Sequence, residues 1–272
     1  MIRVEAMVTL QTAAARLAWS FQGGSPRPPH IRMSDSSFPD TRWTLLRRVR
    51  EGTEAESRTA LETLCRAYWQ PLYGVARRKQ LAEHDAQDAV QGFFESMLRR
   101  ETFAAAEESS GKLRQILLCA FDRYCGQQWL RSQRLKRGAG AVHVEFDGIG
   151  LAEERYLAST GEDTSIETHY NREWATAVME RGLEALRADY LRRGWQQRYE
   201  HLVRSLLQTG QKSNLEQLAK GMDITPGALR VMLHRMRGHY RDKIERELAL
   251  TLDTEDPALI RAEMAELFKA FA

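Results

Sequence analysis

LEQLAKGMDITPGALRVMLHRMRGHYR, residues 215–241, contains two helical patterns separated by a short turn. The first pattern has apolar residues at helical spacing, at Leu215, Leu218, Ala219 and Met222. Asp223 and Ile224 form the turn, and Thr225 and Pro226 open the second pattern. Threonine suits a helix N-cap, and proline suits the first helical turn, where its missing N–H has no partner to lose. The stretch therefore predicts a helix, a tight turn and a second helix.

The second helix of this stretch has two distinct faces. At about 3.6 residues per turn its apolar residues lie within an arc of roughly 100°, and they are Leu229, Met232, Leu233, Met236 and Tyr240. A basic stripe runs beside them, at Arg230, His234, Arg237 and Arg241. The small residues Gly227 and Ala228 precede both, at the end where a recognition helix comes closest to base edges. We expect the basic stripe to meet DNA, because arginine holds phosphates or binds guanine edges bidentately.

Two interpretations of this basic helix compete. A solvated basic face on a core helix is the simpler one for a basic helix that stands alone. The preceding helix and turn favour a helix-turn-helix unit, whose turn often needs a left-handed residue that Asp223 can supply. On that interpretation the candidate DNA contacts are Thr225, Gly227, Ala228, Arg230, Val231, His234, Arg235, Arg237 and Arg241.

Helical periodicity extends over the rest of the chain, with no convincing run of alternating β-branched residues. Apolar residues at helical spacing run from Leu61 to Val75, where Pro71 is a candidate kink. A second helix is expected to start near Glu83 and a third near Gly111. The fold class predicted is all-α.

A glycine-rich break divides the chain into two helical blocks. Gly138, Gly140, Gly148 and Gly150 are followed by the acidic and polar stretch EERYLASTGEDTSIE, residues 153–167. This composition predicts a linker over residues 138–170. Helical periodicity resumes near Asn171 and again from Trp195 to Leu207. A final helix is expected after Asp256 as N-cap and Pro257 at the first position, with one buried face formed by Leu259, Met264, Leu267 and Phe271.

The composition indicates an ordinary globular protein. Of 272 residues, 43% are apolar and 28% are charged, and no stretch approaches the roughly 20 apolar residues of a membrane span. The net charge of +3 does not by itself indicate nucleic acid, so clustering of charge has to carry that argument. The three cysteines, Cys65, Cys119 and Cys125, form no CxxC pair, and we expect buried thiols in a reducing cytoplasm.

The segment RYCGQQWLRSQRLKRGAGAVHV, residues 123–144, is basic and contains no acidic residue. Arginines and a lysine suit the phosphate backbone, and interleaved aromatic residues can stack on unstacked bases of single-stranded DNA. Core packing is the alternative for Phe121 and Tyr124, and it is less obvious for Trp129. The candidate contacts in this segment are Arg123, Tyr124, Gln127, Gln128, Trp129, Arg131, Arg134, Lys136 and Arg137.

The helix expected from Glu83 has an acidic strip. Asp85, Asp88 and Glu95 lie off its apolar face, with Gln91 among them. Such a strip usually means a solvated surface. Next to two DNA-binding elements it indicates a basic protein partner, because DNA would repel it.

These three features, in this order, resemble the sigma-70 family of RNA polymerase initiation factors, in its small extracytoplasmic-function form. DAQDAVQGFF, residues 85–94, resembles the family segment that docks on the clamp helices of the polymerase β′ subunit. AYWQPLYGVARR and GKLRQILLCAF, on either side of it, resemble the flanking helices of sigma domain two. Residues 215–241 resemble the helix-turn-helix of sigma domain four, which reads the minus-35 promoter element.

The composition and the resemblance, which covers roughly Thr41 to the C-terminus, together divide the chain into five regions. They are a disordered extension (1–40), sigma domain two (41–137), the linker (138–170), sigma domain four (171–248) and a C-terminal helical extension (249–272). Residues 123–137 would bind and open the minus-10 element. Asp85, Asp88, Gln91, Phe94 and Glu95 would bind core polymerase. The implied partners are the β′ clamp helices and β flap of core polymerase and promoter DNA, with an anti-sigma factor or other regulator as an optional addition.

Such a protein is a specificity subunit, not an enzyme. The histidines are scattered, and no HExxH, GxSxG or phosphate-binding glycine loop occurs, so no catalytic residue, metal or cofactor is expected. A free-standing helix-turn-helix regulator is the main alternative, and a helical adaptor that binds polymerase without DNA is a weaker one. Translation can start at Met1 or at Met33, which opens MSDSSFPDTRWTLL, and the two starts are held as equal alternatives.

Overall fold

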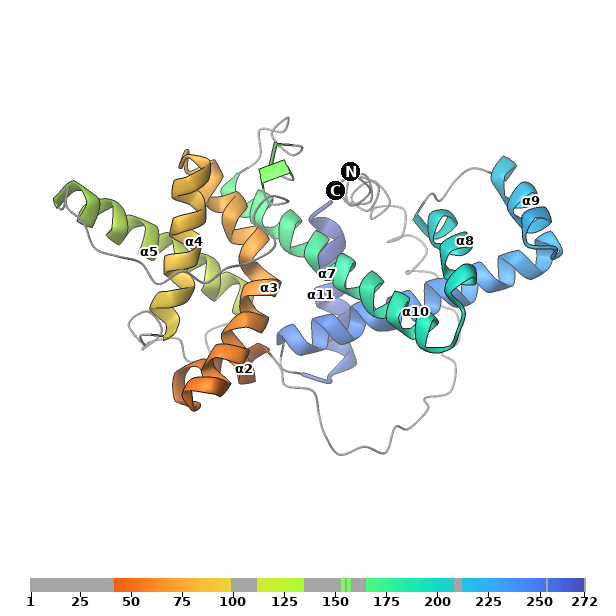
Figure 1. The fold of residues 1–272 in the computed structure, drawn as a ribbon, viewed down its shortest axis with the longest axis horizontal. Coiled ribbons are helices and arrows are strands. Elements are labelled where there is room, and N and C mark those ends of the chain that lie inside the picture. The colour runs from red at the N-terminus through yellow and green to blue at the C-terminus, as the bar shows by residue number, and fades with distance from the viewer. Residues whose placement is uncertain are drawn as a thin grey trace. The chain divides into compact units, whose positions relative to one another are not determined.

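The structure is a computed structural model that describes residues 42–98, 112–134, 153–154, 156–157, 165–207, 212–252 and 254–271. Within these ranges every regular element is a helix (Figure 1), which confirms the all-α prediction for the described part of the chain. None of the described helices is long and apolar enough to cross a membrane. The predicted N-terminal extension, residues 1–40, lies outside the described ranges.

The chain divides into two compact units. The first unit takes in residues 39–174 and 250–254, and the second takes in residues 175–249 and 255–272. The division falls inside a helix, α7 (Ile166–Arg192), which begins within the segment expected to be a linker. The predicted restart of helical structure near Asn171 is therefore five residues late.

The first unit contains α2 (Arg42–Glu51), α3 (Glu54–Arg78), α4 (Glu83–Leu98) and α5 (Leu113–Arg134). A capping box starts α3, because Thr53 accepts from the Glu56 amide while the Glu56 carboxylate accepts from the Thr53 amide. The helix continues through Pro71, which is buried. In this unit α2 packs on α3 and α4, and α4 packs on α3 and α5.

Aromatic side chains form the centre of the first unit. The Phe93 ring lies edge-on to Phe121, with centroids 5.2 Å apart, and also contacts Phe94 and Tyr124. Cys65 is buried in the same unit, and burial raises the pKa of its thiol to about 12. Cys125 is half-buried, with its thiol pKa raised to about 11 mainly by burial. Cys119 is exposed, so the prediction of buried thiols is wrong for this residue.

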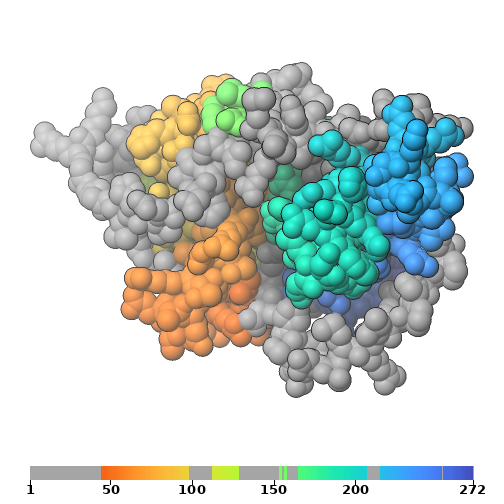
Figure 2. Space-filling view, turned by 45° about the vertical axis from the view of Figure 1, so that its right-hand side comes forward, coloured from red at the N-terminus to blue at the C-terminus, as the bar shows by residue number. Residues whose placement is uncertain are grey.

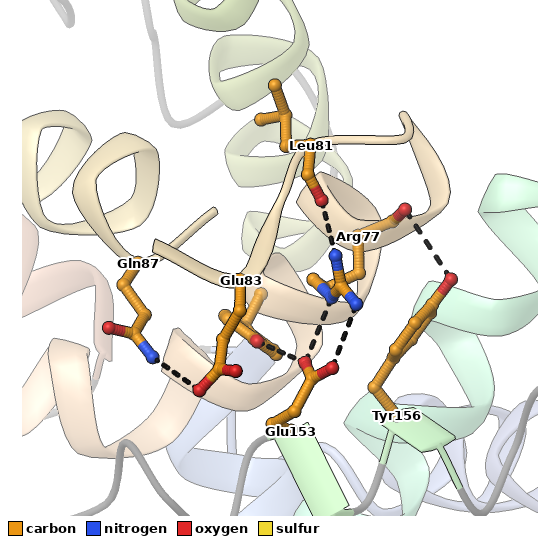
Figure 3. A network of polar contacts seen from close by, with 7 residues as sticks. Arg77, Leu81, Glu83, Gln87, Glu153 and Tyr156 are labelled. Atoms are coloured by element: carbon orange, nitrogen blue, oxygen red, sulfur yellow. Dashed lines mark hydrogen bonds and ion pairs between the residues drawn. The ribbon is translucent and has the colours of Figure 1, made fainter. Parts of the chain in front are cut away.

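Part of the predicted linker lies against α3 (Figure 3). Glu153 accepts hydrogen bonds from Arg77 and from the hydroxyl of Tyr73. The Tyr156 ring lies under the Arg77 guanidinium, 4.9 Å from its centre, and the Tyr156 hydroxyl donates to the Arg77 carbonyl. Glu153 and Tyr156 therefore belong to the packing of the first unit, although both lie in the predicted linker.

The second unit contains the rest of α7 with α8 (Gln196–Leu207), α9 (Lys212–Gly221), α10 (Pro226–Leu252, up to residue 249) and α11 (Pro257–Lys269). The Tyr240 hydroxyl of α10 donates to the Met179 carbonyl of α7 at 2.9 Å. Arg181 and Glu247 join the same two helices through a partly buried ion pair at 2.8 Å. These contacts hold the long helix α10 against α7.

The last helix, α11, starts as predicted. Asp256 caps it by accepting from the Ala258 amide at 2.8 Å, and Pro257 occupies the first position. Met264 and Leu267 are buried, as expected. Leu259 is 54% exposed, so its prediction as a buried residue is wrong. Burial on α11 begins one turn later, at Glu263, because the first turn of the helix is exposed to solvent.

Candidate nucleic-acid interface

The turn between α9 and α10 has the left-handed residue that the sequence predicted. Asp223 has φ of 52°. The Ile224 amide donates back to the Ala219 carbonyl at 3.0 Å, and the Met222 amide donates to the Leu218 carbonyl at 3.1 Å. A left-handed residue after the last turn of a helix lets these carbonyls find donors. Aspartate takes this conformation at less cost than most other side chains.

Thr225 caps α10, the second helix of the helix-turn-helix. Its hydroxyl oxygen accepts from the Ala228 amide at 3.2 Å, and its carbonyl accepts from the Leu229 amide at 3.0 Å. The cap and the tight turn fix where α10 begins relative to α9. Figure 1 shows α9 meeting α10 at this N-terminal end. The predicted helix, turn and helix are therefore present in the second unit.

The faces of α10 separate as its periodicity indicates. Leu229, Leu233, Met236 and Tyr240 are buried, and Met232 is half-buried. The exposed residues of the first turns are Thr225, Gly227, Ala228, Arg230, Val231, His234 and Arg235. Val231 is 50% exposed, although it is apolar. An exposed apolar group between cations suits a base edge, since thymine presents a methyl group in the major groove.

Two of the predicted arginines differ from the others. Arg237 and Arg241 are only half-exposed. Burial lowers the pKa of Arg237, whose Nε is buried without a hydrogen-bond partner. At about 100° per residue Arg237 lies nearer the buried face than Arg230. Among the predicted contacts, Arg230, His234 and Arg235 are the charged or titratable residues that lie fully exposed on this surface.

The structure describes only part of the basic and aromatic segment predicted to bind single-stranded DNA, and that part lies on α5. Arg123, Gln127 and Gln128 are exposed. Tyr124 is half-buried, with its ring edge-on to Phe93 at 5.8 Å and its hydroxyl accepting from Gln128 at 2.9 Å. Helix α5 continues through Trp129, Arg131 and Arg134, whose side chains are outside the described part of the structure. Lys136 and Arg137 lie outside the described residues altogether.

The predicted acidic strip on α4 is exposed at its N-terminal end. Asp85 and Asp88 are exposed, and His84 lies 3.6 Å from Asp88 one turn away. Gln91 and Glu95 are half-exposed and hydrogen-bonded to each other at 3.0 Å. Phe94 is 2% exposed and stacks on Trp69, so its side chain belongs to the core. The accessible strip therefore consists of Asp85, Asp88, Gln91 and Glu95.

The second unit also has a basic and aromatic cluster that sequence reasoning did not assign. Trp195, between α7 and α8, is 38% exposed, and the guanidinium groups of Arg193 and Arg198 lie 5.3 and 4.8 Å from its ring centre. The signal was present in YLRRGWQQRY, residues 190–199, which has three arginines and no acidic residue. Its residues also fit a helical period, which by itself indicates no binding surface.

Within the described residues, no group of histidine, cysteine, aspartate or glutamate side chains is arranged to hold a metal ion. Comparison of the chain with protein-family models, with curated proteins and with solved structures finds no match.

Proposed function

We propose that this chain is an RNA polymerase sigma factor of the sigma-70 family. On this proposal the first unit corresponds to sigma domain two and the second to sigma domain four. The chain would bind core polymerase, recognise the minus-35 and minus-10 promoter elements and assist DNA melting. RNA synthesis itself would belong to the polymerase.

One observation carries the proposal: the chain has a helix-turn-helix with an exposed basic face and, in a separate unit, a helix with an exposed acidic strip. Arg230, His234 and Arg235 on α10 suit the major groove. Asp85 and Asp88 on α4 suit a basic protein surface and would be repelled by phosphates. A protein that reads DNA as part of a larger complex needs both kinds of surface.

A free-standing helix-turn-helix regulator is the alternative that the basic face of α10 also supports. It leaves the acidic strip on α4 without a role. The two functions differ in what they do to transcript start sites. A sigma factor creates new start sites with core polymerase, whereas a regulator changes the use of start sites that another sigma factor already directs.

Mapping transcript 5′ ends in cells that overproduce the chain tests this difference. We expect new 5′ ends whose upstream regions share two short sequence elements, one for each unit. The same experiment with an Asp85→Arg/Asp88→Arg variant should lose these ends. New ends that persist in this variant, or changes confined to existing ends, would support the regulator.

A further inference from the structure

The cluster at the turn between α7 and α8 is exposed, basic and rigidly built. Tyr190 and Tyr199 are buried, with Trp195 edge-on to Tyr190 at 6.0 Å. Tyr190 and Tyr199 are themselves edge-on at 5.8 Å. The indole thus packs on Tyr190 of α7, which in turn packs on Tyr199 of α8. The guanidinium groups of Arg193 and Arg198 both stack on the Trp195 ring.

Within the described part of the chain, neither arginine of this cluster takes part in an ion pair. Two acidic residues flank the cluster in sequence: Asp189 already binds Lys243 and Arg192, and the exposed Glu200 accepts a hydrogen bond from Gln196 at 3.0 Å. The ion pairs given above and the exposed Lys269–Glu266 pair of α11 include neither Arg193 nor Arg198. Stacking on an aromatic ring orders a guanidinium while leaving its N–H donors directed outward. Both groups are therefore ordered and free to bind an anion.

The cluster lies beside α10. Arg193 is close enough to His239 that its charge, after the larger effect of burial, contributes to lowering the pKa of that imidazole. His239 follows the exposed Arg235 by four residues, so the two occupy the same side of α10, one turn apart. Figure 2 shows the teal surface around α8 running into the blue surface of α9 and α10. His239 therefore lies between Arg235 and Arg193, and the charges of Asp242, Asp189 and Lys243 also act on its imidazole.

The position along α10 indicates which part of DNA this surface would meet. The N-terminal residues of a recognition helix reach base edges in a major groove about 8.5 Å deep. Each further helical turn advances about 5.4 Å along the helix axis, so a helix that is inclined to the groove floor rises over three to four turns to the phosphates of the groove edge. His239 lies more than three turns after Pro226, at that level.

We propose that Arg193 and Arg198, ordered on Trp195, form a second contact of this unit with the DNA phosphate backbone. The inference rests on the proposed DNA-binding role of α10 and extends it to a surface outside the helix-turn-helix. Arginine, glutamine and glycine dominate the turn, and such residues contact phosphate and sugar without reading sequence. An acidic protein surface is the competing partner for the same charges.

Salt dependence measures phosphate contacts directly, because each one releases counterions. The experiment uses the full chain and a random-sequence duplex, with anisotropy titrations at several salt concentrations. For Arg193→Ala/Arg198→Ala we expect the slope of log K against log salt to fall by about 1.8, or about 0.9 for each contact. Arg193→Lys/Arg198→Lys keeps both charges and should retain most of the slope. Arg261→Ala, an exposed arginine of α11, removes a charge elsewhere in the unit and should change nothing.

Three results are informative. A reduced slope in the alanine variant, with unchanged circular dichroism and retention by lysine, supports the phosphate contact. An unchanged slope while the wild-type chain binds the duplex overturns it, and leaves the proposed function standing. An unchanged slope together with lost polymerase-dependent transcription also overturns it, and reassigns the cluster to an acidic protein surface. The proposed function fails separately, if the wild-type chain directs no initiation with core polymerase.

Discussion

Arg77 of α3 binds Glu153 through two parallel hydrogen bonds, from Nε at 2.9 Å and from Nη2 at 2.8 Å. Both side chains are largely buried, with exposed fractions of 19% and 15%. A third Arg77 nitrogen donates to the Leu81 carbonyl at 2.5 Å, which fixes the guanidinium at the end of α3. A bidentate pair in this geometry holds Glu153, and with it this part of the predicted linker, on the first unit (Figure 3).

Glu153→Gln should destabilise the first unit and release this segment. Removing one partner of a buried pair leaves the other charge uncompensated, and we expect a loss of about 3 kcal/mol in the free energy of unfolding. Urea unfolding measures the loss, and limited proteolysis measures the release. Glu154→Gln is the matched control, because Glu154 is the exposed neighbour of Glu153. Equal stabilities of the two variants would mean that the ion pair contributes nothing.

His169 makes the stability of the first unit dependent on pH. The imidazole is 3% exposed, and burial, with a smaller effect of the Arg78 charge, lowers its pKa from 6.5 to about 4. Protonation therefore favours the unfolded chain, and the stabilisation by neutral His169 is present above pH 6.5 and is lost as pH falls through 4. Between pH 7 and 4.5 this group alone should cost about 2 kcal/mol.

His169→Leu is the variant that isolates this effect. Urea unfolding at both pH values should show a smaller loss of stability on acidification than in the wild-type chain, by about 2 kcal/mol. His201→Leu replaces an exposed histidine and should leave the loss unchanged. If His169→Leu loses as much stability as the wild-type chain, another group carries the pH dependence.

The acidic strip on α4 should determine affinity for core polymerase. Asp85→Arg with Asp88→Arg reverses two exposed charges, and we expect at least about a tenfold weaker complex, because like charges then face each other. Glu51→Arg with Glu54→Arg reverses two exposed charges at α2 and α3 and serves as the control. Surface plasmon resonance on immobilised core polymerase compares them. Similar affinities for both variants would remove the strip from the docking surface.

Arg230 should read one base pair of the DNA site. It is exposed on the first turns of α10, so Arg230→Ala should relax preference at one position by about 1–3 kcal/mol. A competition binding series with single base changes measures this preference. Arg235→Ala provides the comparison at another exposed arginine of the same helix. An equal loss of affinity on every sequence would instead assign Arg230 to a phosphate.

The sequence predicted local features of the fold well. The N-caps at Thr225 and Asp256, the start of α4 at Glu83 and the left-handed Asp223 all depend on residues a few positions apart. Such features are determined by backbone hydrogen bonds and side-chain geometry within one or two turns. Periodicity also separated the two faces of α10 correctly.

Contacts between distant residues could not be predicted in the same way. Arg77 and Glu153 are 76 residues apart, and no local pattern pairs them. The burial of Phe94 could have been inferred, because it follows the apolar Val90 by four residues on α4. Its assignment to polymerase binding came from the family resemblance and stays a prediction. The exposed cluster around Trp195 was not predicted, because helical periodicity alone does not show whether a tryptophan is buried or exposed.

Run-off transcription with purified core polymerase tests the central claim most directly. The template carries an upstream region that yields new 5′ ends in cells that overproduce the chain. The account predicts a single run-off product that requires both core polymerase and the chain, and that is lost with Asp85→Arg/Asp88→Arg. No product from core polymerase and the wild-type chain, despite binding of the chain alone to the same DNA, would contradict the account and identify a free-standing regulator.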